Sequence, residues 1–291
     1  MKNQIGLLSN SYNSTNEFNI NFELFKQYGV SCLDYQELMS TGSRLHLYNL
    51  SDEEFESHFK KLKKQLDKHG LIVNQLHSLW DPDFEYTHSQ EEVFKCYQKA
   101  IVAAGILHAK YVVYHRIPLK GHYLWDKVDY QELYDLNLDF VRRLLPLAKR
   151  NDVYIAIENL PFFEPKDFFS PNGTLTFINE LNDDHVVMCL DTGHFNMFRE
   201  EKIYEFLLKG KDKVKCLHIH DNNGYSDAHQ VPHLGSFDWE SFLKGLKAIN
   251  FEGILSSETK IPATGLSKKA FELLNDGLIT ILKDMQEYLA H

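Results

Sequence analysis

Short apolar runs alternate with longer amphipathic stretches along the whole chain. Apolar runs of this length, bounded by polar residues, are typical of buried strands. The pattern predicts eight strands, at Gln4–Leu8, Ser31–Tyr35, Leu71–His77, Tyr111–His115, Val153–Glu158, Val186–Asp191, Val214–His220 and Gly253–Glu258.

The stretches between these runs carry apolar residues at helical spacing. Ser51–Glu54 resembles a capping box and predicts a helix that reaches His69 and ends at Gly70, because glycine commonly terminates helices. The segment near Glu17–Tyr28 shows a weaker helical pattern. Further helices are predicted at Gln90–Leu107, Tyr130–Arg150, Thr174–Leu181, Lys202–Leu208, Trp239–Ile249 and Lys268–Leu289.

This alternation of strands and helices predicts the fold class. Strands that alternate with helices of this length form βαβ units, which build parallel sheets. Eight such units in 291 residues predict an α/β fold, a single (β/α)8 TIM barrel that spans residues 1–291, since such barrels contain roughly 250 residues or more. No G-x-G-x-x-G motif follows the first strand, which disfavours a dinucleotide-binding fold.

Composition narrows the class of partner. Hydrophobic residues make up 43% of the chain, enough for one large core, and the formal net charge is -10. Because proteins that bind nucleic acid usually present a basic surface, nucleic acid is not expected as a partner. An acidic barrel suits a metal cation and a small-molecule substrate. No run of about 18 apolar residues is present, so no membrane partner is expected.

Cysteine usage bears on the cellular compartment. Cys32, Cys96, Cys189 and Cys216 form no C-x-x-C pair, and no disulfide framework is expected. The N-terminal segment lacks the features of a signal peptide. A cytoplasmic location is therefore expected, because the cytosol keeps thiols reduced. A homo-oligomer is compatible with the sequence, although no feature indicates one.

Residues that can bind a metal stand at the ends of six predicted strands: His77, His115, Glu158, Asp191, His220 and Glu258. Side chains alternate between the two faces of a strand, so Glu158 shares a face with Tyr154 and Ala156. If that face points inward, all six residues can converge at the carboxyl end of the barrel, where such folds have their active sites. His218 lies deeper on the same face as His220 and is predicted to hydrogen-bond behind a ligand.

A single histidine or carboxylate at a strand end is usually a cap, a surface group or a satisfied core residue. Six of them with consistent parity indicate a common site. Carboxylate and imidazole ligands without thiolate suit Mn²⁺, Mg²⁺, Co²⁺ or Zn²⁺. A cation would also offset the repulsion among the acids.

Four stretches together resemble a known family of barrels. They are Ile155–Asn159, Leu190–His194, Leu217–Asp221 and Ser257–Glu258, and as an ordered set they are similar to the xylose isomerase-like barrel superfamily. That superfamily includes isomerases and epimerases of sugars and sugar phosphates, and the endonuclease IV type of apurinic-site nuclease (AP endonuclease family 2). The resemblance covers nearly the whole chain and implies one divalent ion bound by Glu158, Asp191, His220 and Glu258.

The resemblance also implies substrate contacts. His194, three residues after Asp191, matches a substrate-contacting histidine, and Glu164 matches a second substrate-contacting carboxylate of ketose 3-epimerases. Those epimerases carry an arginine six residues after the metal-binding histidine, where this chain has Ser226. The chain therefore departs from a simple ketose 3-epimerase at one expected residue.

The nuclease branch of the superfamily matches further positions. His77, His115, Asp227 and His229 fall where endonuclease IV has additional zinc ligands, which implies room for more than one Zn²⁺. Leu234–Gly235 also resembles a nuclease element. Many sugar isomerases retain similar residues, however, and Glu158-Asn-Leu-Pro is more similar to the sugar enzymes.

The function implied by the resemblance is a divalent-metal-dependent isomerase or epimerase of a sugar, a sugar phosphate or a keto acid. Glu158 and Glu258 would act as acid and base through an enediolate held by the metal. Three alternatives stay open: an endonuclease IV-like multi-zinc phosphodiesterase on abasic DNA, a metal-dependent sugar dehydratase, and a barrel that binds a sugar or partner without catalysis.

Residues that follow strand ends are further candidates for substrate binding. Arg116 and Lys260 could each hold a phosphate or carboxylate, or be solvated charges at the rim. Trp80 could stack on a sugar or pack within its own loop. The prolines of Trp80–Pro82 and Pro161–Pro165 predict loops over the site, since proline breaks helices.

Overall fold

Eight parallel strands form one sheet, and the sheet closes into a barrel. The computed structural model describes residues 3–10, 16–39, 46–123, 126–161, 168–198, 201–261 and 265–291. The strands are β1 (Ile5–Leu8), β2 (Cys32–Tyr35), β3 (Ile72–His77), β4 (Tyr111–Tyr114), β5 (Tyr154–Glu158), β6 (Val186–Asp191), β7 (Val214–His218) and β8 (Leu255–Ser257). Their order is β7-β6-β5-β4-β3-β2-β1-β8. A parallel bridge between Ile219 and Ser257 joins β7 to β8, which confirms the predicted barrel.

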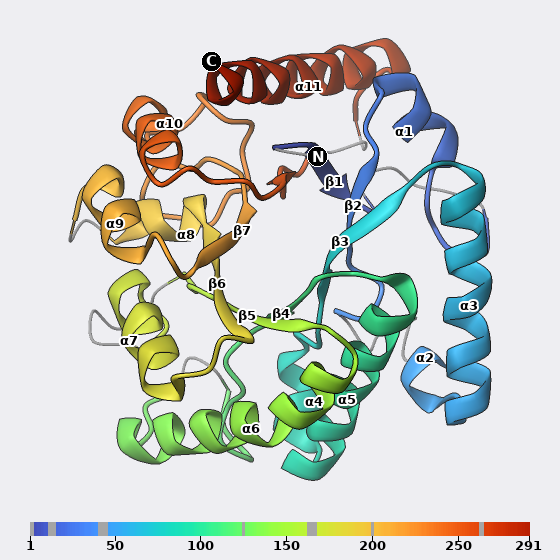
Figure 1. Cartoon of the computed structure of the whole chain (residues 1–291), viewed down its shortest axis with the longest axis vertical. Coiled ribbons are helices and arrows are strands. Elements are labelled where there is room, and N and C mark those ends of the chain that lie inside the picture. The colour runs from blue at the N-terminus through green and yellow to red at the C-terminus, as the bar shows by residue number, and fades with distance from the viewer. Residues whose placement is uncertain are drawn as a thin grey trace.

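Helices surround the barrel (Figure 1). The longer ones are α1 (Phe22–Tyr28), α3 (Asp52–Lys68), α5 (Gln90–Leu107), α6 (Tyr130–Arg150), α7 (Pro171–Leu181), α9 (Ile203–Gly210), α10 (Trp239–Ala248) and α11 (Lys268–Ala290). Ser51 opens α3 with a capping box completed by Glu54, as predicted. Gly29 ends α1 with φ of +66°, a left-handed conformation that glycine adopts without steric cost.

Short helices and strand ends differ from the prediction. The chain also forms α2 (His46–Asn49), α4 (Pro82–Thr87) and α8 (Thr192–Met197), none of which was predicted. Pro82 was expected to mark a loop, but it occupies the first turn of α4, where the backbone N–H groups have no intrahelical partner and proline is tolerated. Three strands end earlier than predicted: His115, His220 and Glu258 lie just beyond the ends of β4, β7 and β8.

Apolar residues form two layers that confirm the predicted parity. The larger layer lies between the strands and the helices and contains Ile155, Ile157 and Leu217. The smaller layer fills the barrel and consists of Tyr111, Val113, Ala156, Val187, Cys189 and Cys216. Glu158, Asp191 and His218 each follow an interior residue of this smaller layer by two positions. They therefore face the interior at the carboxyl end of the barrel.

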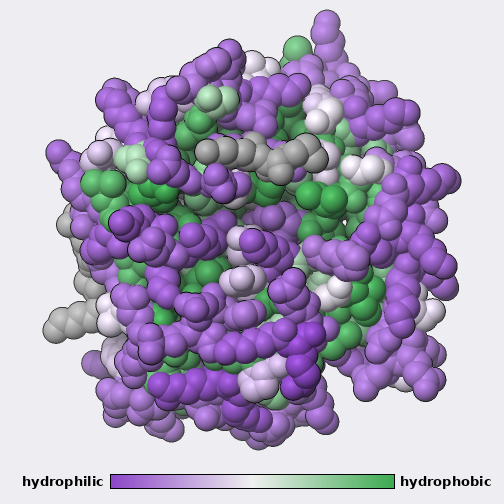
Figure 2. Space-filling model, viewed as in Figure 1, coloured by the Kyte–Doolittle hydropathy of each residue, from purple (hydrophilic) through white to green (hydrophobic). Residues whose placement is uncertain are grey.

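The exterior of the barrel is largely hydrophilic, as the face shown in Figure 2 illustrates. Among the residues that the structure describes, no helix is long and apolar enough to cross a membrane. The four cysteines are free and buried.

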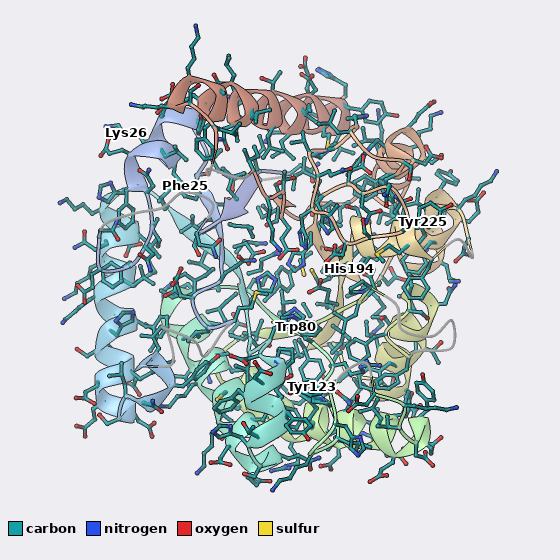
Figure 3. The ribbon with its side chains drawn as sticks, turned by 180° about the vertical axis from the view of Figure 1, so that it is seen from behind. Phe25, Lys26, Trp80, Tyr123, His194 and Tyr225 are labelled. Atoms are coloured by element: carbon teal, nitrogen blue, oxygen red, sulfur yellow. The ribbon has the colours of Figure 1, made fainter. Side chains whose placement is uncertain are left out.

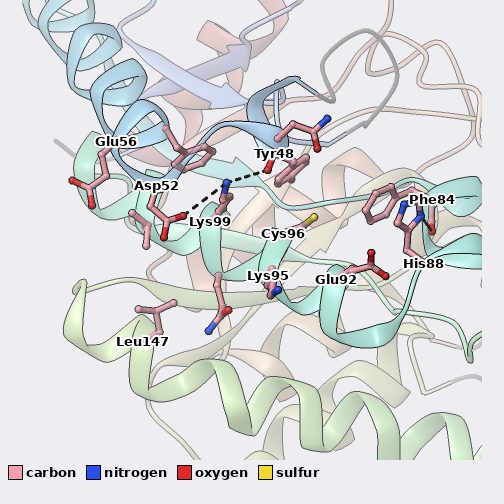
Figure 4. A pocket seen from close by; sticks show the side chains of 14 residues that line it. Tyr48, Asp52, Glu56, Phe84, His88, Glu92, Lys95, Cys96, Lys99 and Leu147 are labelled. Atoms are coloured by element: carbon pink, nitrogen blue, oxygen red, sulfur yellow. Dashed lines mark hydrogen bonds and ion pairs between the residues drawn. The ribbon is translucent and has the colours of Figure 1, made fainter.

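A cavity of about 720 Å³ lies outside the barrel, beside α3, α4 and α5 (Figure 4). We call it the lateral cavity; Tyr48, Phe55, Phe84, Lys95, Cys96 and Lys99 are among the residues that line it. The Lys99 ammonium donates to the backbone carbonyls of Tyr48 at 3.0 Å and Leu50 at 2.6 Å. It also lies 3.9 Å from Asp52 Oδ1.

Candidate metal centre

A smaller cavity, of about 130 Å³, opens at the carboxyl ends of the strands, and its walls include His77, Trp80, His115, Glu158, His194 and Glu258. In Figure 3, Trp80 and His194 lie near the centre of the barrel, whereas Phe25 and Lys26 lie at its periphery. Eleven titratable side chains at this end fall into overlapping groups that could hold a metal. Ten of them form what we call the mouth cluster: His77, His115, Glu158, Asp191, His194, His218, His220, Asp227, His229 and Glu258; the eleventh is Asp34, which is grouped with His77 and His218.

The central group consists of Glu158, Asp191, His218 and Glu258. Each offers one ligand atom, and these atoms lie within 4.8 Å of one another. His218 Nδ1 lies 3.2 Å from Glu158 Oε1, 3.8 Å from Glu258 Oε2 and 3.9 Å from Asp191 Oδ2. The structure thus brings three of the four predicted ligands together with His218, which was predicted only to support a ligand.

His220 falls in a second group, which also contains His194, Asp227 and His229. It still contacts the central group, because its Nε2 lies 2.9 Å from Asp191 Oδ2. Its ring stacks on that of His229, with centroids 4.1 Å apart. Gly193 allows this packing, since a Cβ at that position would lie 2.0 Å from His220 Cε1.

A third group joins His77 and His115 to Glu158. His115 Nε2 lies 3.0 Å from Glu158 Oε2, while Glu158 Oε1 faces His218. His77 Nε2 lies 3.3 Å from Glu258 Oε1. One carboxylate, that of Glu158, therefore belongs to two donor groups at once.

The loop after β7 carries Asp227 and His229. Asp227 Oδ2 lies 3.1 Å from His229 Nε2 and 3.4 Å from His194 Nε2. The buried carboxylate of Asp221 shapes this loop, because it accepts hydrogen bonds from the backbone of Asn222, His233 and Phe237 and from the indole of Trp239. His229 has φ of +46°, a region that residues other than glycine seldom adopt and that is enriched at functional sites.

Imidazoles and carboxylates of the mouth cluster stabilise one another's charged forms. Burial alone would raise the pKa of Glu158, but the charge of His218 and hydrogen bonds from His115 and His194 hold it well below its ordinary value. The pKa of Glu258 is likewise low despite burial, chiefly because of His218 and His77. Burial would lower the pKa of His218, yet the charges of Glu158 and Glu258 raise it well above its ordinary value.

Two polar residues from β2 and its C-terminal extension were not predicted. Asp34 is fully buried, and its Oδ1 lies 2.9 Å from His77 Nδ1. Burial disfavours a charged His77, but the charge of Asp34 raises the pKa of His77 to about 9. Gln36 Nε2 donates to Glu258 Oε1 at 3.0 Å. The signal that could have found Asp34 is its parity, because its neighbours Leu33 and Tyr35 pack on the outer layer.

The donor set fits a divalent cation. Among the described residues, His218 Nδ1 is buried and has no partner in suitable hydrogen-bond geometry, and His218 Nε2 has a close contact with Asp34 Oδ2 at 3.2 Å. Buried polar atoms without partners are costly, and metal ligation is one way to satisfy them. All members of the mouth cluster offer nitrogen or oxygen. Such donors suit Mn²⁺, Mg²⁺, Co²⁺ or Zn²⁺.

The other predicted substrate-binding residues have different environments. Trp80 lines the cavity, with its ring centroid 4.8 Å from that of His115. Lys260 also lines the cavity and is exposed. Arg116 is only 2% exposed, so its interpretation as a solvated rim charge is wrong. Glu164 lies outside the described residues, as does most of Pro161–Pro165.

A closed parallel barrel with carboxylates and imidazoles gathered at its carboxyl end defines this chain as a TIM-barrel protein with a candidate metal centre. The sequence pattern of the family described as Xylose isomerase-like TIM barrel matches residues 22–277. The chain belongs to this family, which confirms the resemblance.

Individual relatives are more distant. The uncharacterized protein MJ1311 of Methanocaldococcus jannaschii is 26% identical over 190 residues, which cover 62% of this chain and 63% of that protein. The D-psicose 3-epimerase of Enterocloster bolteae is 28% identical over 113 residues, or 39% of this chain and 36% of that protein. Both matches span less than two thirds of the relative's length.

Solved structures extend the likeness to the whole chain. A structure described as a D-tagatose 3-epimerase-like protein superposes with a TM-score of 0.70 at 22% sequence identity. The superposition covers 98% of this chain and 99% of that one. At this level of identity the likeness shows a shared fold.

Proposed function

We propose that this chain is a divalent-metal-dependent isomerase or epimerase of a small sugar or sugar derivative. The observation that carries the proposal is the central group, in which two glutamates from non-adjacent strands meet His218 and Asp191 within 4.8 Å. Both glutamates also line the cavity at the barrel mouth. The similarity to a D-psicose 3-epimerase and to a D-tagatose 3-epimerase-like protein supports a sugar as the substrate class.

A divalent ion held by Glu158, Asp191, His218 and Glu258 would supply Lewis acidity, which polarises a substrate carbonyl and acidifies the neighbouring C–H bond. The protein supplies the proton-transferring groups. In the metal-free protein, the neighbouring imidazoles hold the pKa values of Glu158 and Glu258 low, so both side chains are carboxylates. Glu158 is positioned by His115 and His218, and Glu258 by His77 and Gln36.

The placement of the two glutamates favours epimerisation over isomerisation. Strand β5, which ends in Glu158, and β8, which precedes Glu258, are three positions apart around the ring. Two carboxylates from such strands would reach a sugar bound between them from different sides. One can remove a proton from a carbon and the other can return a proton to its opposite face, which inverts that carbon.

The remaining cavity walls set how a sugar would bind. Trp80 offers an aromatic face beside His115, and aromatic faces pack against the C–H groups of sugars. His194 faces Glu158 and Asp227 and can donate to a substrate hydroxyl. Lys260 supplies a positive charge at the rim for a phosphorylated or carboxylated sugar. The free, buried cysteines accord with the reducing cytosol in which we expect the protein to act.

A deuterium-exchange panel tests this function. Ketoses, sugar phosphates and keto acids are incubated with the metal-loaded protein in D₂O, and incorporation at carbon is followed by NMR. We expect incorporation into at least one sugar, and a loss of about 100- to 10,000-fold in Glu258→Gln and Glu158→Gln. Glu85→Gln, a buried acid-to-amide change in α4, is the matched control. Full exchange by Glu258→Gln would refute its role as a base.

A multi-zinc phosphodiesterase acting on abasic DNA is the second candidate. The second and third donor groups, which contain His77, His115, His194, Asp227 and His229, favour it. The number of tightly bound ions separates the two functions. Three zinc ions per chain together with cleavage of an abasic oligonucleotide would support the phosphodiesterase. One exchangeable ion and no cleavage would support the sugar enzyme.

A further inference from the structure

Asp34 lies beneath the central group, where three strands meet. Its side chain is fully buried. Gln75 Nε2 donates to Asp34 Oδ2 at 2.9 Å and to the backbone carbonyl of Leu217 at 3.2 Å. Asp34 Oδ1 lies 2.9 Å from His77 Nδ1, and Asp34 Oδ2 lies 3.2 Å from His218 Nε2. One carboxylate on β2 thus contacts side chains from β3 and β7.

Asp34 faces a different ring nitrogen in each of the two histidines. His77 faces Asp34 with Nδ1 and reaches Glu258 Oε1 with Nε2, at 3.3 Å. His218 faces Asp34 with Nε2 and reaches Glu158 Oε1 with Nδ1, at 3.2 Å. Their rings stack with centroids 4.6 Å apart and an interplanar angle of 21°. Each ring therefore has one nitrogen on Asp34 and the other within the mouth cluster.

A carboxylate only accepts hydrogen bonds, so the nitrogen that faces it must carry the proton. In a neutral imidazole the other nitrogen then has a free lone pair, which is what a metal requires. We propose that Asp34 is a positioning residue whose single carboxylate fixes the tautomers of His77 and His218, and so prepares both for metal ligation. His77 would carry its proton on Nδ1 and His218 on Nε2. Asp34 acts in this way only if the mouth cluster binds a metal, as the proposed function requires.

His77 and His218 form one candidate donor group with Asp34 itself, and each also belongs to a further group, so Asp34 would influence any ion that either histidine binds. His218 belongs to the central group and His77 to the group with His115 and Glu158. Replacement of Asp34 by asparagine leaves one acceptor oxygen and adds an NH₂ donor. The amide can then accept from one imidazole only, and the other histidine loses its orientation.

Nitrogen NMR of the wild-type, zinc-loaded protein tests the tautomers directly. Two-bond ¹H–¹⁵N correlations on ¹⁵N-histidine-labelled protein report which ring nitrogen carries the proton. We expect Nδ1–H for His77 and Nε2–H for His218. The reverse tautomer at either residue would overturn the proposal. The expected tautomers in a zinc-loaded protein that exchanges no sugar proton would support the role of Asp34 and count against the proposed function.

Metal affinity tests the consequence. We expect Asp34→Asn to bind Zn²⁺ about 10- to 100-fold more weakly by calorimetry, the usual effect of losing a carboxylate behind a histidine ligand. Glu85→Gln should stay within about twofold of wild type. A purely structural role would lower the stability of metal-free Asp34→Asn while its zinc affinity stayed unchanged, and that result would overturn the proposal. If Asp34→Asn does not fold, the wild-type tautomers decide.

Discussion

The mouth cluster and the lateral cavity show two ways in which a protein places polar groups near empty space. The lateral cavity is the larger, at about 720 Å³ against about 130 Å³. The Lys99 ammonium there donates hydrogen bonds to two backbone carbonyls. Burial raises the pKa of Cys96 to about 12, which keeps that thiol protonated. At the mouth, side chains from several strands face one another instead. Convergence of donors, more than cavity size, marks the candidate site.

In the described part of the chain, Glu85 is a buried acid without an oppositely charged partner, and it can be compared with Glu158 and Glu258, which have such partners. It is 2% exposed, and neither carboxyl oxygen has a hydrogen-bond partner among the described residues. Burial raises the pKa of Glu85 well above its ordinary value. Glu158 and Glu258 are as deeply buried, but their pKa values are low because imidazoles surround them. Burial thus favours the neutral form of one glutamate, whereas neighbouring imidazoles favour the ionised form of the other two.

The largest expected effect is a loss of metal affinity on replacement of His218, compared with replacement of His220. We expect His218→Gln to weaken Zn²⁺ or Mn²⁺ binding at the central group by more than about 100-fold, because loss of a ligand should exceed the loss of a residue behind one. His220→Gln should cost no more than about tenfold. Calorimetric titration of both variants gives the comparison. The opposite ranking would restore the ligand set that the family resemblance implied.

The next effect concerns pH. His77, which faces Asp34, Glu258, His115 and His218, has its pKa raised to about 9. A pKa raised by folding adds stability that is fully present below pH 6.5 and is lost as pH rises through about 9. Metal-free protein should therefore lose on the order of 2 kcal/mol of unfolding free energy between pH 6.5 and 9.5. Urea unfolding in the presence of a chelator measures this.

Protein with an ion bound at His77, in the group with His115 and Glu158, should lack that decrease, because ligating imidazoles are already deprotonated. The variant His77→Gln should lack it as well, even without metal. A metal-free wild type whose stability stays constant over this range would show that His77 is not held in its charged form.

A smaller effect is expected at the lateral cavity. Lys99→Met removes two hydrogen bonds to backbone carbonyls and should lower the unfolding free energy by about 1–3 kcal/mol. The hydrocarbon stem is kept, so the packing loss is small. Zinc affinity should remain within about twofold of wild type. A clear drop in affinity would show that the two cavities are energetically coupled.

The smallest effect is expected at Lys260. Its exposed charge at the rim should contribute no more than about 1 kcal/mol to binding of an anionic sugar. Lys260→Ala should therefore raise KM for a phosphorylated substrate by up to about fivefold and leave KM for its unphosphorylated counterpart unchanged. Paired KM measurements check this. Equal changes for both substrates would exclude a role in charge recognition.

The sequence predicted the barrel because its apolar pattern alternates between strand and helix periods over the whole chain. Strand parity also predicted that Glu158, Asp191 and Glu258 would meet. Strand parity could not tell which of His218 and His220 joins the central group, because residues two apart on a strand share a face. The choice depends on where β7 ends, and strand ends are set by tertiary hydrogen bonds.

Asp34 and the loop after β7 were harder to predict for other reasons. A lone aspartate within a short apolar run gives little sign that it will contact two histidines from other strands. The positions of Asp227 and His229 depend on how Asp221 folds the loop, through four hydrogen bonds that have no sequence signature. The role of Glu164 in substrate binding stays a prediction.

The bridge between Ile219 and Ser257 is a short connection between the strands that complete the ring. His218 ends one of these strands, and Glu258 directly follows the other. Among the described residues, β7 and β8 are the two end strands of the sheet order, and this bridge joins them. An ion bound by both His218 and Glu258 would form a second link between these strands. Metal binding should therefore add most to the stability of the β7–β8 junction, because there the ion supplements a single bridge between the strands.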